Sequence, residues 1–120
     1  IRPMSDYPKA VRIHEEGPRE GFQIESPDIP TAQKVRFIES LAETGLKQID
    51  CLGLVNPKRV PGMADAEEVA RGIRRRPGVR YTGLWLNMKG LERLAGLVPP
   101  AWRAAGVGLH HDRLRLQLRR

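Results

Sequence analysis

Arg19 and Glu20 stand side by side in the segment GPREGFQ (residues 17–23), where one proline and two glycines flank them. A guanidinium can stabilise an oxyanion or an enolate. A carboxylate can hold Mg²⁺ or Mn²⁺, because both ions accept oxygen ligands. Adjacent residues on a regular strand point to opposite faces, but a turn beyond a strand can direct both into one pocket. A solvated charge pair in a surface turn explains the dipeptide more simply. Only the surrounding sequence can distinguish such a turn from an active site.

The surrounding chain alternates between segments typical of strands and of helices. Strands are predicted at residues 11–14, 46–54 and 79–86. A loop with two glycines and three prolines is predicted at residues 15–30. Three helices are also predicted. The first has Thr31 as its N-cap and Gly45 just past its end, the second runs from an Asp65 N-cap to Arg76, and the third begins near Met88. The arginines at 74–76 would then lie in the last turn of the second helix, where positive charge interacts favourably with the helix dipole.

This repeated strand–helix order predicts an α/β fold with parallel strands and right-handed crossovers. The predicted strands end near His14, Asp50 and Asn87, which are 36 and 37 residues apart. The order favours a (β/α)₈ TIM barrel over a doubly wound sheet, because the loop after the first strand is long and lacks G-x-G-x-x-G. A full barrel takes about 250 residues, so this chain would form its N-terminal portion, about three βα units. Barrel enzymes carry their chemistry at the C-terminal ends of the strands, where Arg19 and Glu20 are expected.

Three motifs resemble those of the hydroxymethylglutaryl-CoA lyase family, in the family's order. GPREGFQ resembles G-P-R-D-G-x-Q, and residues 55–65, VNPKRVPGMAD, are similar to V-x-P-K-x-V-P-x-M-A-D. Residues 86–90, LNMKG, resemble the N-x-K-G turn after the third strand. The resemblance runs from about residue 11 to residue 94. It implies the pyruvate-carboxyltransferase-like TIM barrel of metal-dependent lyases and synthases.

The resemblance also implies roles for single residues. Glu20 would ligate the divalent metal, Mg²⁺ or Mn²⁺, and Arg19 would stabilise the enolate formed when a carbon–carbon bond breaks. Asp50 would pair with Arg19, while Gln23 and Asn87 would support the substrate pocket. The implied reaction is retro-Claisen cleavage of a 3-hydroxy-3-methylglutaryl-CoA-type thioester to acetyl-CoA and a keto acid, which makes an acyl-CoA the expected partner.

Two of these positions depart from the family pattern, and one family motif has no counterpart. Glu20 replaces the usual Asp, and Asp50 replaces the usual Glu. The family's metal site also takes an H-x-H pair from a late strand. His110 and His111 are adjacent, so on a strand they would point apart, and they cannot reproduce that pair. The metal site is therefore expected to be incomplete in this chain, and His14 is expected to be packed or hydrogen-bonded.

Two other functions remain open at this stage. The first is a Claisen-condensing acyltransferase of the isopropylmalate, citramalate or homocitrate synthase type, against which the VNPKRVPGMAD segment argues. The second is a catalytically inactive fragment, or a subunit that depends on association. An open three-stranded sheet exposes its strand edges, so a homo-oligomer is one way to cover them.

The last part of the chain differs from the rest. Six of the 21 basic residues and only one acidic residue lie after residue 92, which accounts for most of the net charge of +7. We therefore divide the chain into a barrel-like domain, residues 1–94, and an atypical basic tail, residues 95–120. A frameshift or truncation would explain the tail, and so would a genuine amphipathic strand with alternating arginine and leucine.

Composition excludes several classes of protein. The basic tail has no aromatic platform or binding motif for nucleic acid, so no nucleic-acid partner is expected. No apolar run approaches the ~20 residues of a membrane span, and the first residues lack the apolar region of a signal peptide. A single cysteine, Cys51, excludes an internal disulfide and fits a cytoplasmic location. We expect Cys51 to be a small residue of the core.

Overall fold

Three parallel strands form the centre of the protein in the computed structural model, which describes residues 6–97, 108–110 and 115–117. Strand β2 (Gln48–Leu54) lies between β1 (His14–Glu15) and β3 (Arg80–Trp85), and both pairings are parallel. Two short strands extend this sheet beyond β3. β5 (Arg115–Gln117) pairs antiparallel with β3, and β4 (Gly108–His110) pairs antiparallel with β5. The strand order is therefore β1-β2-β3-β5-β4.

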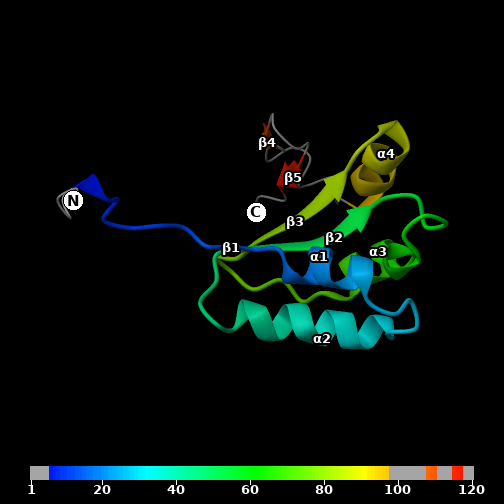
Figure 1. Ribbon diagram of the computed structural model, residues 1–120, viewed down its shortest axis with the longest axis horizontal. Coiled ribbons are helices and arrows are strands. Elements are labelled where there is room, and N and C mark those ends of the chain that lie inside the picture. Colours follow the sequence, from blue (N-terminus) through cyan, green and yellow to red (C-terminus); the bar gives the residue numbers. More distant parts are fainter. Residues whose placement is uncertain (1–5, 98–107, 111–114, 118–120) are drawn as a thin grey trace.

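A helical segment follows each of the parallel strands. The chain passes from β1 through α1 (Gly17–Ile24) and α2 (Thr31–Ala42) to β2, then through the short 3₁₀ turn η2 (Pro61–Met63) and α3 (Ala66–Gly72) to β3. Helix α4 (Met88–Leu97) follows β3. Figure 1 shows α2 running along the strands and the segment before β1 extending away from the body. None of the described helices is long and apolar enough to cross a membrane.

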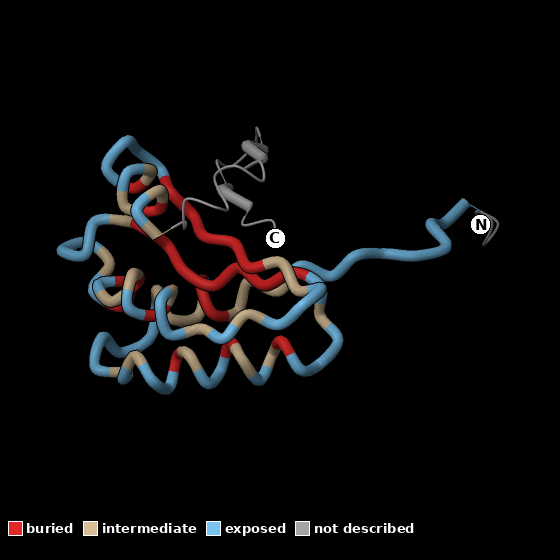
Figure 2. Tube along the Cα trace, turned by 180° about the vertical axis from the view of Figure 1, so that it is seen from behind, coloured by how far each residue is buried: buried red, intermediate tan, exposed pale blue. Residues whose placement is uncertain are grey.

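The core lies between the sheet and its helices. Every residue of β2 is buried, as expected for a central strand of a parallel sheet that is covered on both faces. Ile49 of β2 and Ile38 of α2 are fully buried, and Val69 of α3 and Leu94 of α4 join the same apolar cluster. Figure 2 shows buried residues along the strands and, at intervals, on the inner face of α2. Burial of one such side chain contributes about 2 kcal/mol.

The predicted α/β fold with parallel strands is confirmed, but the first predicted loop is wrong. Residues 17–24 form helix α1 directly after β1, whereas residues 15–30 were expected to be a loop. Pro18 lies in the first turn of α1, where its missing N–H costs no hydrogen bond. The predicted strand at residues 11–14 is shorter and later, because only His14–Glu15 pairs with β2.

Two predicted helix boundaries are corrected as well. Thr31 is the first residue of α2 rather than its N-cap, which is Pro30. Asp65 does precede α3, but its carboxylate makes no capping hydrogen bond and accepts one from Thr31 instead, at 2.6 Å. Helix α3 ends at Gly72, so the arginines at 74–76 lie beyond it and do not complete its last turn.

The last part of the chain is described only in β4 and β5. Residues 98–107, 111–114 and 118–120 lie outside the described residues. Helix α4 continues past residue 94 to Leu97. The part of the tail in which arginine and leucine alternate contains β5, as predicted for an amphipathic strand. The boundary between residues 94 and 95, and the origin of the basic tail, stay predictions.

Gly62 allows the backbone of η2 to touch the backbone of α1. A Cβ atom at this position would lie 2.0 Å from the carbonyl oxygen of Phe22. Both groups belong to the main chain, so neither can rotate away. The close approach of η2 to α1 therefore requires glycine.

We expect Gly62→Ala to lower the free energy of unfolding by about 3 kcal/mol, because the added methyl group forces the two backbones apart. Chemical unfolding followed by circular dichroism measures this change. Gly96→Ala is the matched control. Among the described residues, apart from its chain neighbours and the backbone of its own helix, nothing lies within 4 Å of the added Cβ, so stability should be unchanged or slightly higher. Equal stability of the two variants would contradict the close approach.

Candidate active site

A buried ion pair joins helix α1 to the centre of the sheet. Nε of Arg19 donates to Oδ2 of Asp50 at 2.7 Å, and the side chains are 4% and 2% exposed. The sequence placed Asp50 at the end of a strand, but it is the third residue of β2. Arg19 is long enough to reach back from α1 to that position. The predicted pairing of Arg19 with Asp50 is present in the structure.

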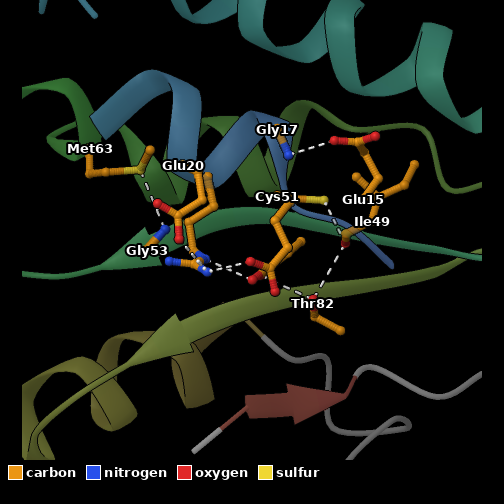
Figure 3. Close-up of polar contacts among 11 residues, drawn as sticks. Glu15, Gly17, Glu20, Ile49, Cys51, Gly53, Met63 and Thr82 are labelled. Atoms are coloured by element: carbon orange, nitrogen blue, oxygen red, sulfur yellow. Dashed lines mark hydrogen bonds and ion pairs between the residues drawn. The ribbon is translucent and has the colours of Figure 1, made fainter. Parts of the chain in front are cut away.

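Two further carboxylates lie against the same guanidinium. Nη2 of Arg19 is 3.0 Å from Oε1 of Glu20 and 3.2 Å from Oε2 of Glu16. Both come from the start of α1, where one helical turn separates Glu16 from Arg19. Figure 3 shows Glu20 on the helix side of β2, near Gly53. The side chain of Glu20 is 54% exposed, so one face of the cluster is open to solvent.

Asp50 is held from the neighbouring strand. Oγ1 of Thr82 on β3 lies 3.1 Å from Oδ1 of Asp50 and 3.4 Å from the carbonyl oxygen of Ile49 (Figure 3). Thr82 stands opposite Asp50 in the parallel register. The register of this parallel pair then shifts between Asp50 and Leu52. One oxygen of the carboxylate thus faces Thr82 and the other faces Arg19.

The surrounding charges fix the protonation of Arg19. Burial by itself lowers the pKa of a guanidinium, but the hydrogen bond and charge of Asp50, with the charges of Glu20 and Glu16, more than offset that effect. The pKa of Arg19 is therefore raised above its usual value. Arg19 remains a cation across the pH range in which proteins fold.

Gln23 lies on the same helix as Arg19. Its Nε2 is 3.6 Å from where a Cβ of Gly53 would stand, so Gln23 lies beside β2. The amide of Gly53 meets Sδ of Met63 at 3.4 Å (Figure 3). A role of Gln23 in supporting the pocket stays a prediction. A contact with substrate stays a prediction.

Asn87 is placed differently. Its Oδ1 accepts a hydrogen bond from the amide of Gly90 at 2.9 Å, so Asn87 acts as the N-cap of α4. Its side chain is exposed, and the structure does not join it to the Arg19 cluster within the described residues. A role of Asn87 in binding substrate stays a prediction.

The described residues do not form a complete metal site. No three His, Cys, Asp or Glu side chains in residues 6–97, 108–110 and 115–117 gather closely enough to hold a metal ion. Glu20 fits as one ligand, because its half-exposed carboxylate is at the open side of the cluster. His14 was expected to be packed or hydrogen-bonded, and its exposure rules out the first of these. His111 lies outside the described residues.

Cys51 belongs to the core, as the sequence suggested. It is 3% exposed, and its Sγ lies 3.4 Å from the carbonyl oxygen of Ile49. Burial, together with the nearby charge of Asp50, raises the pKa of the thiol to about 12. A thiol in this state is not a nucleophile at neutral pH.

Sequence reasoning missed two contributors to the site. Glu16 was overlooked because GPREGFQ was taken for a turn, whereas a helix places Glu16 three residues before Arg19 on one face. Thr82 was overlooked because its position depends on the strand register. Aligning the predicted second and third strands as a parallel pair would have suggested Thr82.

Parallel βα units with an arginine–carboxylate cluster at the sheet define a protein of the TIM-barrel class. No protein-family model matches the chain. Mouse mitochondrial hydroxymethylglutaryl-CoA lyase is 47% identical over 89 residues, which cover 74% of this chain and 27% of the mouse protein. A Pseudomonas aeruginosa protein, 3-hydroxy-3-isohexenylglutaryl-CoA/hydroxy-methylglutaryl-CoA lyase, is 48% identical over 72% of this chain and 29% of its own length.

A solved structure agrees with these relatives. The crystal structure of the Bacillus subtilis HMG-CoA lyase superposes with a TM-score of 0.72 at 44% identity and covers 76% of this chain. The chain spans about 30% of that structure. The chain belongs to the hydroxymethylglutaryl-CoA lyase family, and its three strands match part of the barrel of that family. The alternatives of a condensing synthase and of an inactive fragment gain no support from these relatives.

Removing either partner of the Arg19–Asp50 pair should destabilise the protein, because it leaves the other charge buried. We expect Arg19→Met to lower the free energy of unfolding by about 3 kcal/mol. Asp50→Leu should cost less, since Glu16 and Glu20 still face the guanidinium. The double variant should cost about 2 kcal/mol less than the sum of the two, as urea unfolding would measure. Additive single effects would show that the two residues are not coupled.

The Cys51 thiol should resist alkylation in the folded protein. At pH 8 a group with a pKa of about 12 is almost wholly protonated, and burial also blocks the reagent. We expect no modification by iodoacetamide over an hour, as mass spectrometry would show, and complete modification in guanidinium chloride. Rapid modification without denaturant would contradict the buried placement of Cys51.

Proposed function

We propose that this chain supplies the enolate-stabilising part of a hydroxymethylglutaryl-CoA lyase active site. The reaction is retro-Claisen cleavage of a 3-hydroxy-3-methylglutaryl-CoA-type thioester to acetyl-CoA and a keto acid. One observation carries the proposal: the buried ion pair between Arg19 and Asp50, in a chain that is 44–48% identical to the lyases described above. The chain covers less than a third of those lyases, so activity, substrate and partners are proposed for the protein to which this segment belongs.

Arg19 would act on the charge that develops during cleavage. When the bond between C2 and C3 of the substrate breaks, its electron pair stays on C2 and the thioester oxygen takes up negative charge as an enolate. The hydroxyl at C3 loses its proton and becomes the carbonyl of the keto acid. Protonation of the enolate at C2 then gives acetyl-CoA. A fixed guanidinium stabilises this enolate more than it stabilises the neutral thioester, which lowers the barrier.

Asp50 and Thr82 would prepare Arg19 for this role. Asp50 holds Nε, and Thr82 holds Asp50, so the plane of the guanidinium is set before substrate arrives. Glu16 and Glu20 contact Nη2. We assign the enolate oxygen to Nη1, the guanidinium nitrogen outside these contacts among the described residues.

Glu20 would provide one ligand to a divalent metal, Mg²⁺ or Mn²⁺. When bound, such an ion polarises the hydroxyl and carbonyl oxygens of the substrate. The described residues offer one suited carboxylate and not a complete site, so the role proposed for this chain is to hold one side of the ion. The extra methylene of Glu20, relative to the Asp of the family motif, lengthens its reach. We also propose a cytoplasmic location, which the single buried thiol supports.

The test of this function is an assay for acetyl-CoA. Purified protein with 3-hydroxy-3-methylglutaryl-CoA and Mn²⁺ or Mg²⁺ should release acetyl-CoA and a keto acid, detected by chromatography and mass spectrometry. Arg19→Lys should lower kcat by at least about 100-fold, because an ammonium cannot keep the same fixed donors. Arg36→Lys, at an exposed position of α2, is the matched control and should leave kcat unchanged.

Binding of Mn²⁺ gives a second readout that needs no turnover. Glu20→Gln should weaken Mn²⁺ binding, measured by electron paramagnetic resonance of the free ion, whereas Glu25→Gln at an exposed site should not. No product with either metal from the protein to which this segment belongs, or an Arg19→Lys variant of that protein as active as the original, would refute the lyase proposal. Unchanged Mn²⁺ binding in Glu20→Gln would remove Glu20 from the metal site.

A further inference from the structure

We propose that Lys34 is a positioning residue for Arg19: its buried ammonium joins α2 to η2 and to Phe22 of α1, and so sets where α1 lies over β2. The importance of this role rests on the proposed function of Arg19, but the contacts themselves do not.

The ammonium of Lys34 is buried and has well-placed partners. Lys34 is 3% exposed, which is rare for a lysine unless it is paired. Its Nζ donates to the carbonyl oxygen of Gly62 at 2.6 Å and to Oδ1 of Asp65 at 2.7 Å. These acceptors lie in η2 and directly before α3, about 30 residues further along the chain. Lys34 therefore fixes the segment around Gly62 against α2.

The carboxylate of Asp65 accepts hydrogen bonds from two residues of α2. Thr31 donates to Oδ2 at 2.6 Å while Lys34 donates to Oδ1. Burial alone raises the pKa of this carboxyl, but the hydrogen bonds from Lys34 and Thr31 outweigh it and hold the pKa below its usual value. Asp65 is therefore charged at neutral pH. Thr31 and Lys34 are three residues apart, so one face of the helix presents both donors.

The third contact of Lys34 leads to the helix that carries Arg19. Its Nζ lies 5.4 Å from the centre of the Phe22 ring, within the range of a cation–π interaction. The same ring packs edge to face against Phe37 of α2, with centroids 5.8 Å apart. The carbonyl of Phe22 also meets Gly62, whose own carbonyl accepts from Lys34. Lys34 thus acts on α1 both through the ring of Phe22 and through η2.

The position of Phe22 affects the ion pair because Phe22 and Arg19 belong to the same helix, α1. Phe22 follows Arg19 by three residues, so both lie on one side of an eight-residue helix. A shift of Phe22 tilts that helix and moves the guanidinium relative to Asp50. The hydrogen bond from Nε is 2.7 Å long and would weaken with a small displacement.

Nuclear magnetic resonance of the Arg19 Nε–H group tests this inference without any assay of turnover. In the original chain a buried Nε–H that donates to a carboxylate should exchange slowly with solvent, and its signal is assigned by its loss in Arg19→Met. Lys34→Met keeps the apolar stem and removes the ammonium. We expect exchange of the Arg19 Nε–H to be at least about tenfold faster in Lys34→Met, because α1 opens more readily.

Arg93→Met is the matched control. Arg93 also ties elements together, since it pairs with Glu67 of α3 and donates to the carbonyl oxygen of Val55 at 2.9 Å. Within the described residues, no hydrogen bond or ion pair joins Arg93 to α1. Its loss should destabilise the protein and leave exchange of the Arg19 Nε–H within about twofold of the original, relative to the global stability of each variant. The comparison separates positioning from a general loss of stability.

A milder variant decides the case if Lys34→Met does not fold. Thr31→Val removes one hydrogen bond to Asp65 and should speed exchange of the Arg19 Nε–H by about threefold. Unchanged exchange in a folded Lys34→Met, or in Thr31→Val if only that variant folds, would overturn the inference, as would equal acceleration in Arg93→Met. Faster exchange in a chain without lyase activity would support Lys34 as a positioning residue while refuting the proposed function.

Discussion

The buried pair of Arg19 and Asp50 is the interaction on which the arrangement of this protein depends. A charge removed from water is tolerated only with a partner in good geometry, so neither side chain can be placed independently of the other. Asp50 is fixed by the central strand and by Thr82 of its neighbour. Helix α1 must therefore lie where its arginine meets that carboxylate, and the 3₁₀ turn η2 and helix α2 are packed to hold α1 there.

Rigid contacts on the other side of α1 complete this constraint. Gly62 lets two backbones touch, and the ammonium of Lys34 ties the same turn to α2. These contacts use groups with narrow geometric tolerance, namely main-chain atoms and a buried charge. A site that must stabilise a developing negative charge gains from such rigidity, because donors fixed in advance need no reorganisation during the reaction. The motif VNPKRVPGMAD thus helps to position α1 through two of its residues. Gly62 in η2 packs against the backbone of α1, and Asp65 binds Lys34.

Charged and uncharged groups of β2 lie close together in this region but on separate sides of the strand. The guanidinium of Arg19 contacts the carboxylates of Glu16, Glu20 and Asp50, and Glu20 lies at the exposed side of this cluster. An exposed carboxylate at that side suits the divalent metal proposed above. By contrast, Cys51 lies next to Asp50 in sequence yet belongs to the apolar core, where burial keeps its thiol protonated. Neighbours in the chain have separate roles because successive side chains of a strand point to opposite faces of the sheet.

The sequence alone determined the parallel α/β order, the strands around Asp50 and Thr82 and the core position of Cys51, because these follow from local periodicity, which depends on few residues at a time. The pairing of Arg19 with Asp50 was implied by the resemblance to the lyase family. The tertiary structure decided that residues 17–24 are helical and that Thr31 donates to the carboxylate of Asp65, which is the N-cap residue of α3 but makes no side-chain cap bond. It also decided that Glu16 contacts Arg19 and that Thr82 contacts Asp50. Glycine and proline in residues 17–24 predict a loop, whereas in the structure these residues form a helix that packs against η2. Contacts across more than 30 residues depend on strand register and helix packing, and local sequence does not specify either.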